Sequence, residues 1–303
     1  MSVLKKALLF FGVILLSTSI WYFFVKTNDF EVVIHIETAP GTVYQNILNW
    51  NKNLNADTKR TAITKKQPFH KITNTYKFED RTLEFDWNIH KINDSVTKVS
   101  VGINDPDQSI ATRFKKLIGN STVAKLLDNE FSGFNEVLTN HVDRFDVVVE
   151  GEAESPEFYV AYINVSCAQE EKANNMISSS AYINAFLVNN DIKLLSNPFV
   201  EITDWSIDGG LINFNFCFPI EKQSDFPIHK EIKYKKVSAK KSVKATFYGN
   251  YSFSDNAWFT LYQYIKDNKL TRKESITEVF LNNPHTAGGK DSTWKALIYM
   301  EIE

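Results

Sequence analysis

Glu278 is the residue of this sequence best placed for chemistry. Strand-like alternation puts it between Ile276 and Phe280 on one face of a predicted strand. A carboxylate between two apolar neighbours can bind a ligand cation, and in a desolvated cleft it can also act as a general acid or base. On a solvent-exposed edge strand the same glutamate would only be solvated. What covers this face therefore decides its role.

Aromatic side chains on the predicted strands are candidate walls for such a cleft. The chain has 23 Phe, 12 Tyr and 6 Trp, which is more than a routine core needs. Each ring beside a bound cation adds cation–π attraction of about 0.5–2 kcal/mol. The candidate ligand-binding residues besides Glu278 are Phe280, Tyr162, Trp205, Phe216, Tyr248 and Trp294. Taken singly, each of these rings also fits a hydrophobic core.

Other catalytic and cofactor motifs are not found. The sequence has no HExxH, paired-cysteine, GxSxG or Walker A pattern, and its six histidines lack ligand spacing. Gly288-Gly289-Lys290 lacks the upstream glycine and the following Ser or Thr of a phosphate loop, so it is interpreted as a loop. We expect no metal and no cofactor, and no catalytic residue unless Glu278 is one.

The two cysteines, Cys167 and Cys217, are too few for a disulfide scaffold or a cysteine-based zinc site. They fall in two predicted strands of one domain, where a single bridge is geometrically allowed. Two buried small hydrophobic residues are the favoured interpretation.

The length and net charge of the chain limit the number of domains and the kinds of partner to expect. A chain of 303 residues predicts about two domains, each with its own core. The formal net charge is only -2, and no helix-turn-helix pattern is found, so nucleic acid is not an expected partner.

The C-terminal half contains an internal repeat. A strand at 158–165, a helix at 170–188 and strands at 200–207 and 211–218 form the first unit, in which Asp208-Gly209-Gly210 predicts a hairpin turn. The second unit has a strand at 242–248, a helix at 254–268 and strands at 274–281 and 294–302. Trp258, Leu261, Tyr262 and Ile265 recur at helical spacing and form the buried stripe of the second helix. Two such units related by a pseudo-twofold axis would leave a cleft between them.

This tandem strand-helix-strand-strand unit resembles the GyrI-like, AraC-type effector-binding family. The resemblance is carried by Tyr248-Gly249-Asn250-Tyr251, TLYQYIKDNKL, ITEVFLNNP and WKALIYMEIE. It implies that Glu278, which precedes the Asn282-Asn283-Pro284 turn, lies at the centre of the ligand cleft. Phe280 stands where the family has a tyrosine, so any chemistry that needs that phenol is put in doubt.

The preceding region, 29–148, has a strand at 30–36, a helix opening at Pro40, strands at 72–78, 83–89 and 96–103, and a long helix. Val123, Leu127, Phe131, Phe134 and Leu138 give that helix one apolar stripe. The order predicts an α+β domain, and with TAPGTVYQNILNW after the first strand it resembles the START-related, polyketide-cyclase-like superfamily (SRPBCC). The resemblance implies a helix-grip fold with a hydrophobic ligand cavity. A degenerate domain that serves as spacer or interaction surface is the alternative.

The N-terminal residues 1–28 are predicted to be a transmembrane anchor. Residues 7–25 read ALLFFGVILLSTSIWYFFV and are long enough to cross a bilayer as a helix. A cleaved signal peptide is the alternative, because Ser17-Thr18-Ser19 is a run of small residues, but the apolar residues after it favour an uncleaved anchor. Lys5 and Lys6 place the N-terminus in the cytoplasm and the domains outside, on the periplasmic side.

We therefore expect an α+β protein with a membrane anchor, a helix-grip domain at 29–148 and a GyrI-like domain at 155–303. Its expected function is binding of an amphipathic or cationic small molecule through Glu278. A hydrolase acting on electrophilic small molecules and a non-catalytic scaffold for protein partners are the alternatives. Enzymatic activity is the less favoured interpretation, because Phe280 lacks the hydroxyl.

Overall fold

The computed structural model describes residues 3–58, 61–207, 210–282 and 291–303. The chain divides into two compact units. The N-terminal unit runs to Glu37 and continues over Val43–Leu138, and the C-terminal unit comprises Thr38–Thr42 and Thr139–Glu303. The mixed α+β class with two antiparallel sheets agrees with the expectation from sequence.

The N-terminal unit begins with the apolar helix α1 (Val3–Ile20), which continues into a π-helical turn, η1 (Trp21–Val25). The stretch Val3–Val25 has a mean hydropathy of 2.2 and none of it is buried, so it is long and apolar enough to cross a membrane. An N-terminal signal sequence meets the same criterion.

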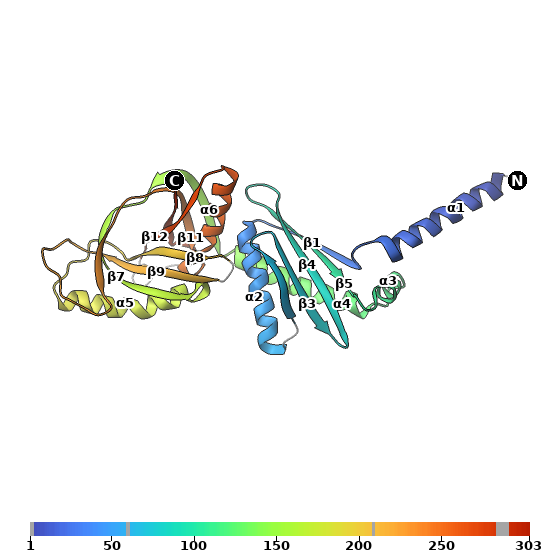
Figure 1. Ribbon diagram of the computed structural model, residues 1–303, viewed down its shortest axis with the longest axis horizontal. Coiled ribbons are helices and arrows are strands. Elements are labelled where there is room, and N and C mark those ends of the chain that lie inside the picture. Colours follow the sequence, from blue (N-terminus) through green and yellow to red (C-terminus); the bar gives the residue numbers. More distant parts are fainter. Residues whose placement is uncertain (1–2, 59–60, 208–209, 283–290) are drawn as a thin grey trace. The chain divides into compact units, whose positions relative to one another are not determined.

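A five-stranded antiparallel sheet follows, in the order β1-β5-β4-β3-β2 (Figure 1). Its strands are β1 (Phe30–Ile36), β2 (Thr61–Gln67), β3 (Lys71–Phe78), β4 (Arg81–Lys91) and β5 (Thr97–Asn104). Three helices accompany it: α2 (Pro40–Thr58), α3 (Ser109–Leu117) and α4 (Thr122–Val142). The apolar stripe predicted for the long helix is the buried face of α4.

Aromatic rings occupy the space between this sheet and α4. Trp87 on β4 lies 5.4 Å from Phe131 and 5.2 Å from Phe134, ring centroid to ring centroid. Trp50 on α2 lies 5.8 Å from Trp87. These contacts place a packed aromatic core where the SRPBCC resemblance implies a ligand cavity, and that resemblance stays a prediction.

The C-terminal unit is built on an eight-stranded antiparallel sheet in the order β10-β7-β9-β8-β12-β13-β11-β6. Its strands are β6 (Phe145–Glu154), β7 (Phe158–Ala168), β8 (Phe199–Ser206), β9 (Leu211–Pro219), β10 (Lys233–Val237), β11 (Lys241–Gly249), β12 (Arg272–Phe280) and β13 (Lys295–Ile302). The helical segments are η2 (Gln169–Glu171), α5 (Lys172–Asn189), η3 (Tyr251–Phe253), α6 (Asn256–Asp267) and η4 (Asp291–Thr293).

The predicted repeat is present in this sheet. The first unit contributes β7-β9-β8 and the second contributes β12-β13-β11, so the two halves meet at the pairing of β8 with β12. The same strand order read from either end is the pattern of a pseudo-twofold axis between these strands. The hairpin predicted at Asp208-Gly209-Gly210 connects β8 and β9, and residues 208 and 209 lie outside the described residues, as do Asn283 and Pro284 of the second predicted turn.

The boundary between the units lies earlier than expected. The N-terminal unit ends at Leu138 rather than at residue 148, because β6 pairs along its length with β11 in the second sheet. Residues 145–154 therefore belong to the C-terminal unit.

Strands β2, β6 and β10 were not anticipated, and each is the outermost strand of its sheet. β2 (TAITKKQ) and β10 (KYKKV) carry lysines, and none of the residues of β6 is buried. In β2 and β10 only Thr61 and Val237 are buried, so neither strand has the alternating burial that identifies central strands. β6 alternates between half-buried and exposed side chains along its length.

Gly249, which ends β11, has a φ of +136°. An added Cβ would lie 2.7 Å from the backbone oxygen of Arg144. We expect Gly249→Ala to lower the free energy of unfolding of the C-terminal unit by about 1–3 kcal/mol, measured by urea unfolding followed by circular dichroism. Gly133→Ala in α4 is the control, because its new methyl meets nothing within 4 Å, and it should stabilise by up to about 1 kcal/mol. Equal unfolding curves for Gly249→Ala and wild type would contradict the expected strain.

Candidate ligand site in the C-terminal unit

Glu278 lies near the middle of the eight-stranded sheet and its side chain is fully buried. In the register it is opposite Val200 of β8 on one side and Ile298 of β13 on the other. Isolated in such surroundings, an ionised carboxylate would be strongly destabilised, so it requires a partner.

Three side chains supply that partnership. The Lys172 ammonium lies 2.8 and 2.7 Å from the two carboxylate oxygens of Glu278. Trp258 donates its indole N–H to Glu278 Oε1 at 2.6 Å. The Ser254 hydroxyl lies 3.2 and 3.1 Å from the same oxygens and accepts a hydrogen bond of 2.8 Å from Lys172. The carboxylate is therefore neutralised and hydrogen-bonded from within the protein.

The starts of the two repeated helices position these donors. Lys172 is the first residue of α5, immediately after the 3-10 turn η2, and it is 2% exposed. Ser254 directly follows η3, and Trp258 lies in the first turn of α6. Both helices thus begin over the same face of the sheet, and the Lys172 ammonium also lies 4.7 Å from the Trp258 ring. We call Glu278, Lys172, Ser254 and Trp258 the central cluster.

A second layer surrounds the central cluster. Trp205 on β8 packs edge-on against Trp258, with 5.4 Å between ring centroids, and donates its indole N–H to Gln169 at 2.9 Å. Gln169 in turn donates to Asp255 at 2.6 Å. The Arg272 guanidinium lies over the Trp205 ring at 5.1 Å, and burial lowers the pKa of Arg272. The central cluster is therefore flanked by the Trp205 ring and by the partly desolvated Arg272 guanidinium.

Phe280 and Trp294 lie beside a further ring, that of Tyr251. The centroid of the Tyr251 ring is 4.6 Å from that of Phe280 and 5.4 Å from that of Trp294. The Tyr251 hydroxyl donates to the Lys295 carbonyl at 2.8 Å, and burial raises its pKa. The Tyr251 phenol beside Phe280 is thus hydrogen-bonded to the backbone at the start of β13.

The remaining predicted wall residues divide between the two faces of the sheet. Phe216 on β9 pairs with Val200, which pairs with Glu278, so Phe216 lies on the face of the central cluster. Tyr162 pairs with Cys217, the neighbour of Phe216, and therefore lies on the opposite face. Tyr248 likewise lies on the opposite face, since its neighbour Phe247 pairs with Ala296.

The expected aromatic wall around Glu278 needs correction at these two positions. Tyr162 and Tyr248 point away from it because successive side chains of a strand alternate between faces. A lysine ammonium lies over each of their rings, that of Lys235 at 4.8 Å from Tyr162 and that of Lys295 at 5.1 Å from Tyr248.

The same alternation separates the two cysteines. Cys167 pairs with Ile212 and Cys217 with Tyr162, which puts their side chains on opposite faces. Both are free thiols, and burial raises the pKa of Cys217 well above its ordinary value.

The face opposite the central cluster carries a second buried carboxylate, that of Glu201. It accepts a hydrogen bond from Asn215 at 2.8 Å and pairs with Lys235. Glu201, Ser275 and Lys240 are among the residues that line a cleft of about 420 Å³ on this side. Among the residues that the structure describes, no group of three or more His, Cys, Asp or Glu side chains is placed to hold a metal ion.

Sequence reasoning found Glu278 but missed Lys172 and Ser254, and it treated Trp258 as core alone. One signal for Lys172 was present. A lysine at the start of a helix opposes the helix macrodipole, so its placement there indicates a compensating anion. That anion is 106 residues away along the chain.

Comparison with known proteins gives a family for the C-terminal unit. Residues 153–303 match the model of the GyrI-like small molecule binding domain. No curated protein matches the sequence. The solved structures it resembles include the EcmrR C-terminal domain, with 18% identity over 52% of this chain and 98% of that chain and a TM-score of 0.44.

SAV2435 bound to tetraphenylphosphonium is 10% identical over 52% of this chain and 94% of that chain, with a TM-score of 0.37. A hydrolase from Listeria innocua is 12% identical over 53% and 92% of the two chains, with a TM-score of 0.29. The tandem repeat, the order of its motifs and the family match agree. Residues 153–303 are therefore a GyrI-like small molecule binding domain.

Proposed function

We propose that this protein is a membrane-anchored small-molecule receptor or carrier, and that its GyrI-like domain binds an amphipathic, cationic ligand at Glu278. The observation that carries the proposal is the central cluster. A fully buried carboxylate receives its counter-ion from Lys172, which begins the helix over it. Such a site is already built to hold a cation beside aromatic rings.

The Lys172 ammonium already occupies the position beside Glu278 that a ligand cation would need. A ligand cation near Glu278 has to take the position of Lys172 Nζ, because two cations at one carboxylate would repel each other. Trp258 and Trp205 offer ring faces and edges for the apolar part of the ligand, as they do now for Lys172 and Arg272. The ligand class is therefore a lipophilic cation large enough to contact both rings.

Access to the site is expected through α5. Of its 18 residues only Lys172, Ile183 and Leu187 are buried, whereas α6 buries six of its 12 residues. Among the first ten residues of α5, Lys172 has the one fully buried side chain, and the others are half-buried or exposed. Segments with few buried apolar side chains open at low free-energy cost, so displacing Lys172 would release this half of the helix.

The anchor is part of the same proposal. We assign Val3–Val25 as a transmembrane helix with its N-terminus in the cytoplasm, on the strength of its apolar composition, its unburied surface and the preceding Lys5 and Lys6. Arg113 supports a fixed connection to the first domain, since its guanidinium donates to the carbonyls of Tyr22 and Lys26 at 2.6 and 2.7 Å.

Titration with tetraphenylphosphonium tests the site. We expect Lys172→Met to bind this cation more tightly than wild type, because the competing ammonium is gone. Lys172→Met/Glu278→Gln should bind roughly 10–100-fold more weakly than Lys172→Met, because these two variants differ only in the charge of one carboxylate. Calorimetry and tryptophan fluorescence, which reports on Trp258 and Trp205, measure both changes.

Lys244→Met is the matched control for loss of a lysine. It removes a partly exposed ion pair with Glu150 on another part of the sheet and should leave binding as in wild type. Equal affinity of Lys172→Met and of the double variant for tetraphenylphosphonium would contradict the proposal that Glu278 holds the ligand cation.

A further inference from the structure

Helix α3 in the N-terminal unit exposes its apolar face and buries its polar face, which is the reverse of the usual arrangement in a soluble protein. An amphipathic helix normally turns its apolar stripe inward and its polar side to water. In α3 and the residue after it, four large apolar side chains at helical spacing are 52–60% exposed: Ile110, Phe114, Leu117 and Ile118. Contiguous apolar exposure of this kind indicates a binding surface.

The polar face of α3 is the one that is docked. Ser109 and Arg113 both donate to Asp29 Oδ1 at 2.5 Å, and Thr112 donates to Asp105 Oδ2 at 2.8 Å. Arg113 is 5% exposed and Asp29 is 1% exposed. The network holds α3 in this orientation, so the outward direction of the apolar stripe is built into the fold.

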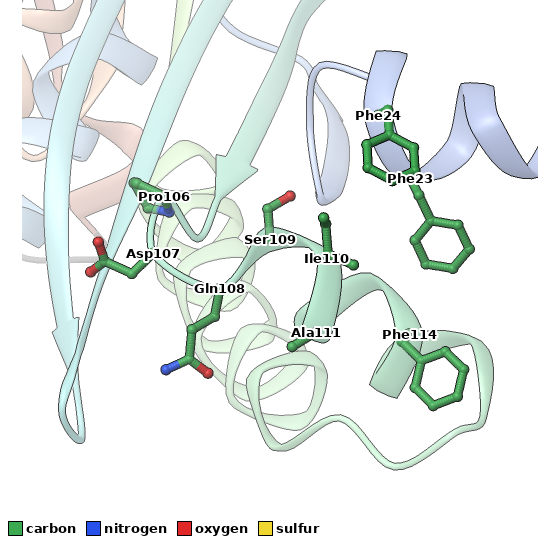
Figure 2. A pocket seen from close by; sticks show the side chains of 9 residues that line it. All are labelled: Phe23, Phe24, Pro106, Asp107, Gln108, Ser109, Ile110, Ala111 and Phe114. Carbon is green, nitrogen blue, oxygen red and sulfur yellow. The ribbon is translucent and has the colours of Figure 1, made fainter.

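The apolar stripe lies beside the anchor. A groove of about 870 Å³ runs between η1 and the start of α3, with Phe23 and Phe24 on one side and Ile110, Ala111 and Phe114 on the other (Figure 2). In Figure 2 the rings of Phe23 and Phe114 and the side chain of Ile110 lie around the space between the two helices. Pro106, Asp107, Gln108 and Ser109 also line the groove.

A second groove, of about 390 Å³, joins Leu117 to the anchor itself. It is lined by residues of α1 and η1 that include Phe11, Ile14 and Thr18. Leu117 of α3 thus shares an apolar groove with the anchor, as Phe114 does with η1.

The charge of Lys116 on α3 is directed the other way. The Lys116 ammonium donates to the Asp29 carbonyl at 3.2 Å and lies 4.5 Å from the Phe30 ring, at the start of β1. A long basic side chain that turns back toward the domain while its apolar neighbours face outward is the arrangement of a residue at a membrane surface.

We propose that α3 is an interfacial membrane helix, with Ile110, Phe114, Leu117 and Ile118 among the acyl chains of the phospholipids around the anchor. Those acyl chains fill the two grooves. The inference rests on the proposed anchor, and it adds that the first domain meets the bilayer through a second element in a set orientation. Continuity of the apolar surface from α1 through η1 to α3 selects lipid as the occupant.

Fluorescent labelling of the full-length protein in phospholipid nanodiscs tests this inference. Single cysteines at Phe114→Cys, Leu15→Cys and Val137→Cys are labelled with an environment-sensitive dye, in a chain with Cys167→Ser and Cys217→Ala. Leu15 reports on the anchor. Val137 is the matched control, since it is 59% exposed on α4 and lies 15 residues, or about 22 Å, from the start of that helix.

We expect the label at 114 to give blue-shifted emission, to be quenched by nitroxide-labelled lipid and to be protected from aqueous iodide, as at position 15. The label at 137 should behave as in water. Aqueous behaviour at 114 with lipid behaviour at 15 overturns the role of α3 and leaves the anchor intact, whereas aqueous behaviour at 15 overturns both. Protection at 114 from both quenchers shows a protein contact in place of lipid and also overturns the inference.

Discussion

Lys172→Met is expected to lower the free energy of unfolding of the C-terminal unit by about 3–5 kcal/mol. This is the cost found when one partner of a buried ion pair is removed and the other charge is left uncompensated. Lys172 and Glu278 form such a buried ion pair, because their side chains are 2% and 0% exposed. Trp258 and Ser254 would still contact the carboxylate, but neither carries a charge. Urea unfolding followed by tryptophan fluorescence measures the change, since Trp205, Trp258 and Trp294 lie in the C-terminal unit.

The second half of this experiment separates charge from packing. Lys172→Met/Glu278→Gln removes both charges, so most of the lost stability should return, since a buried pair replaced by neutral groups of similar volume is often neutral in stability. Lys244→Met, whose pair with Glu150 is partly exposed, should change stability by less than about 1 kcal/mol. A double variant as unstable as Lys172→Met would show that the lysine acts through packing instead of charge.

Arg113→Gln is expected to produce the largest effect in the N-terminal unit, again about 3–5 kcal/mol. It leaves the buried Asp29 carboxylate without its cation and frees two backbone carbonyls at the end of the apolar N-terminal helix. Arg113→Lys should recover little of the loss. An ammonium cannot reproduce the fork whose Nε, Nη1 and Nη2 reach three separate acceptors.

Hydrogen exchange of the detergent-solubilised full chain measures this effect, because a two-unit protein need not unfold in one transition. Faster exchange should be confined to the ends of η1, β1 and α3. Lys91→Gln, which breaks the exposed pair with Asp94, should leave exchange unchanged. Unaltered protection in Arg113→Gln would contradict a role of Arg113 in holding the apolar N-terminal helix to the domain.

Local periodicity explains why much of the fold was predictable. The stripe of α4 from Val123 to Leu138 and the alternation of β4 record which side of each element is buried. The repeat in the C-terminal half was recognised for the same reason, since its strands are central in the sheet. The edge strands β2 and β10 carry little of this record, because most of their side chains are exposed or half-buried. β6 alternates between half-buried and exposed side chains but buries none of them fully. Helix α3 was missed as well, and its apolar stripe faces outward.

The candidate site was predictable in part. Glu278 stands out because a carboxylate between Ile276 and Phe280 is unusual on a buried face. Its role in binding a ligand stays a prediction. The faces of Tyr162 and Tyr248 were not predictable from their strands alone. Both positions depend on how β7 and β11 are registered against their neighbours, and a shift of one residue reverses every side chain.

Three features could be predicted from the sequence alone, since each is a property of neighbouring residues: the apolar N-terminal helix, the repeated strand-helix-strand-strand order and one unusual glutamate. The pairing of Lys172 with Glu278 and the contact of Arg113 with the end of the N-terminal helix became visible in the folded chain. These partners are 106 residues apart in the first case and 84–91 in the second. A buried charge selects its partner by proximity in space, which the packing of whole elements creates and which no local pattern along the chain encodes.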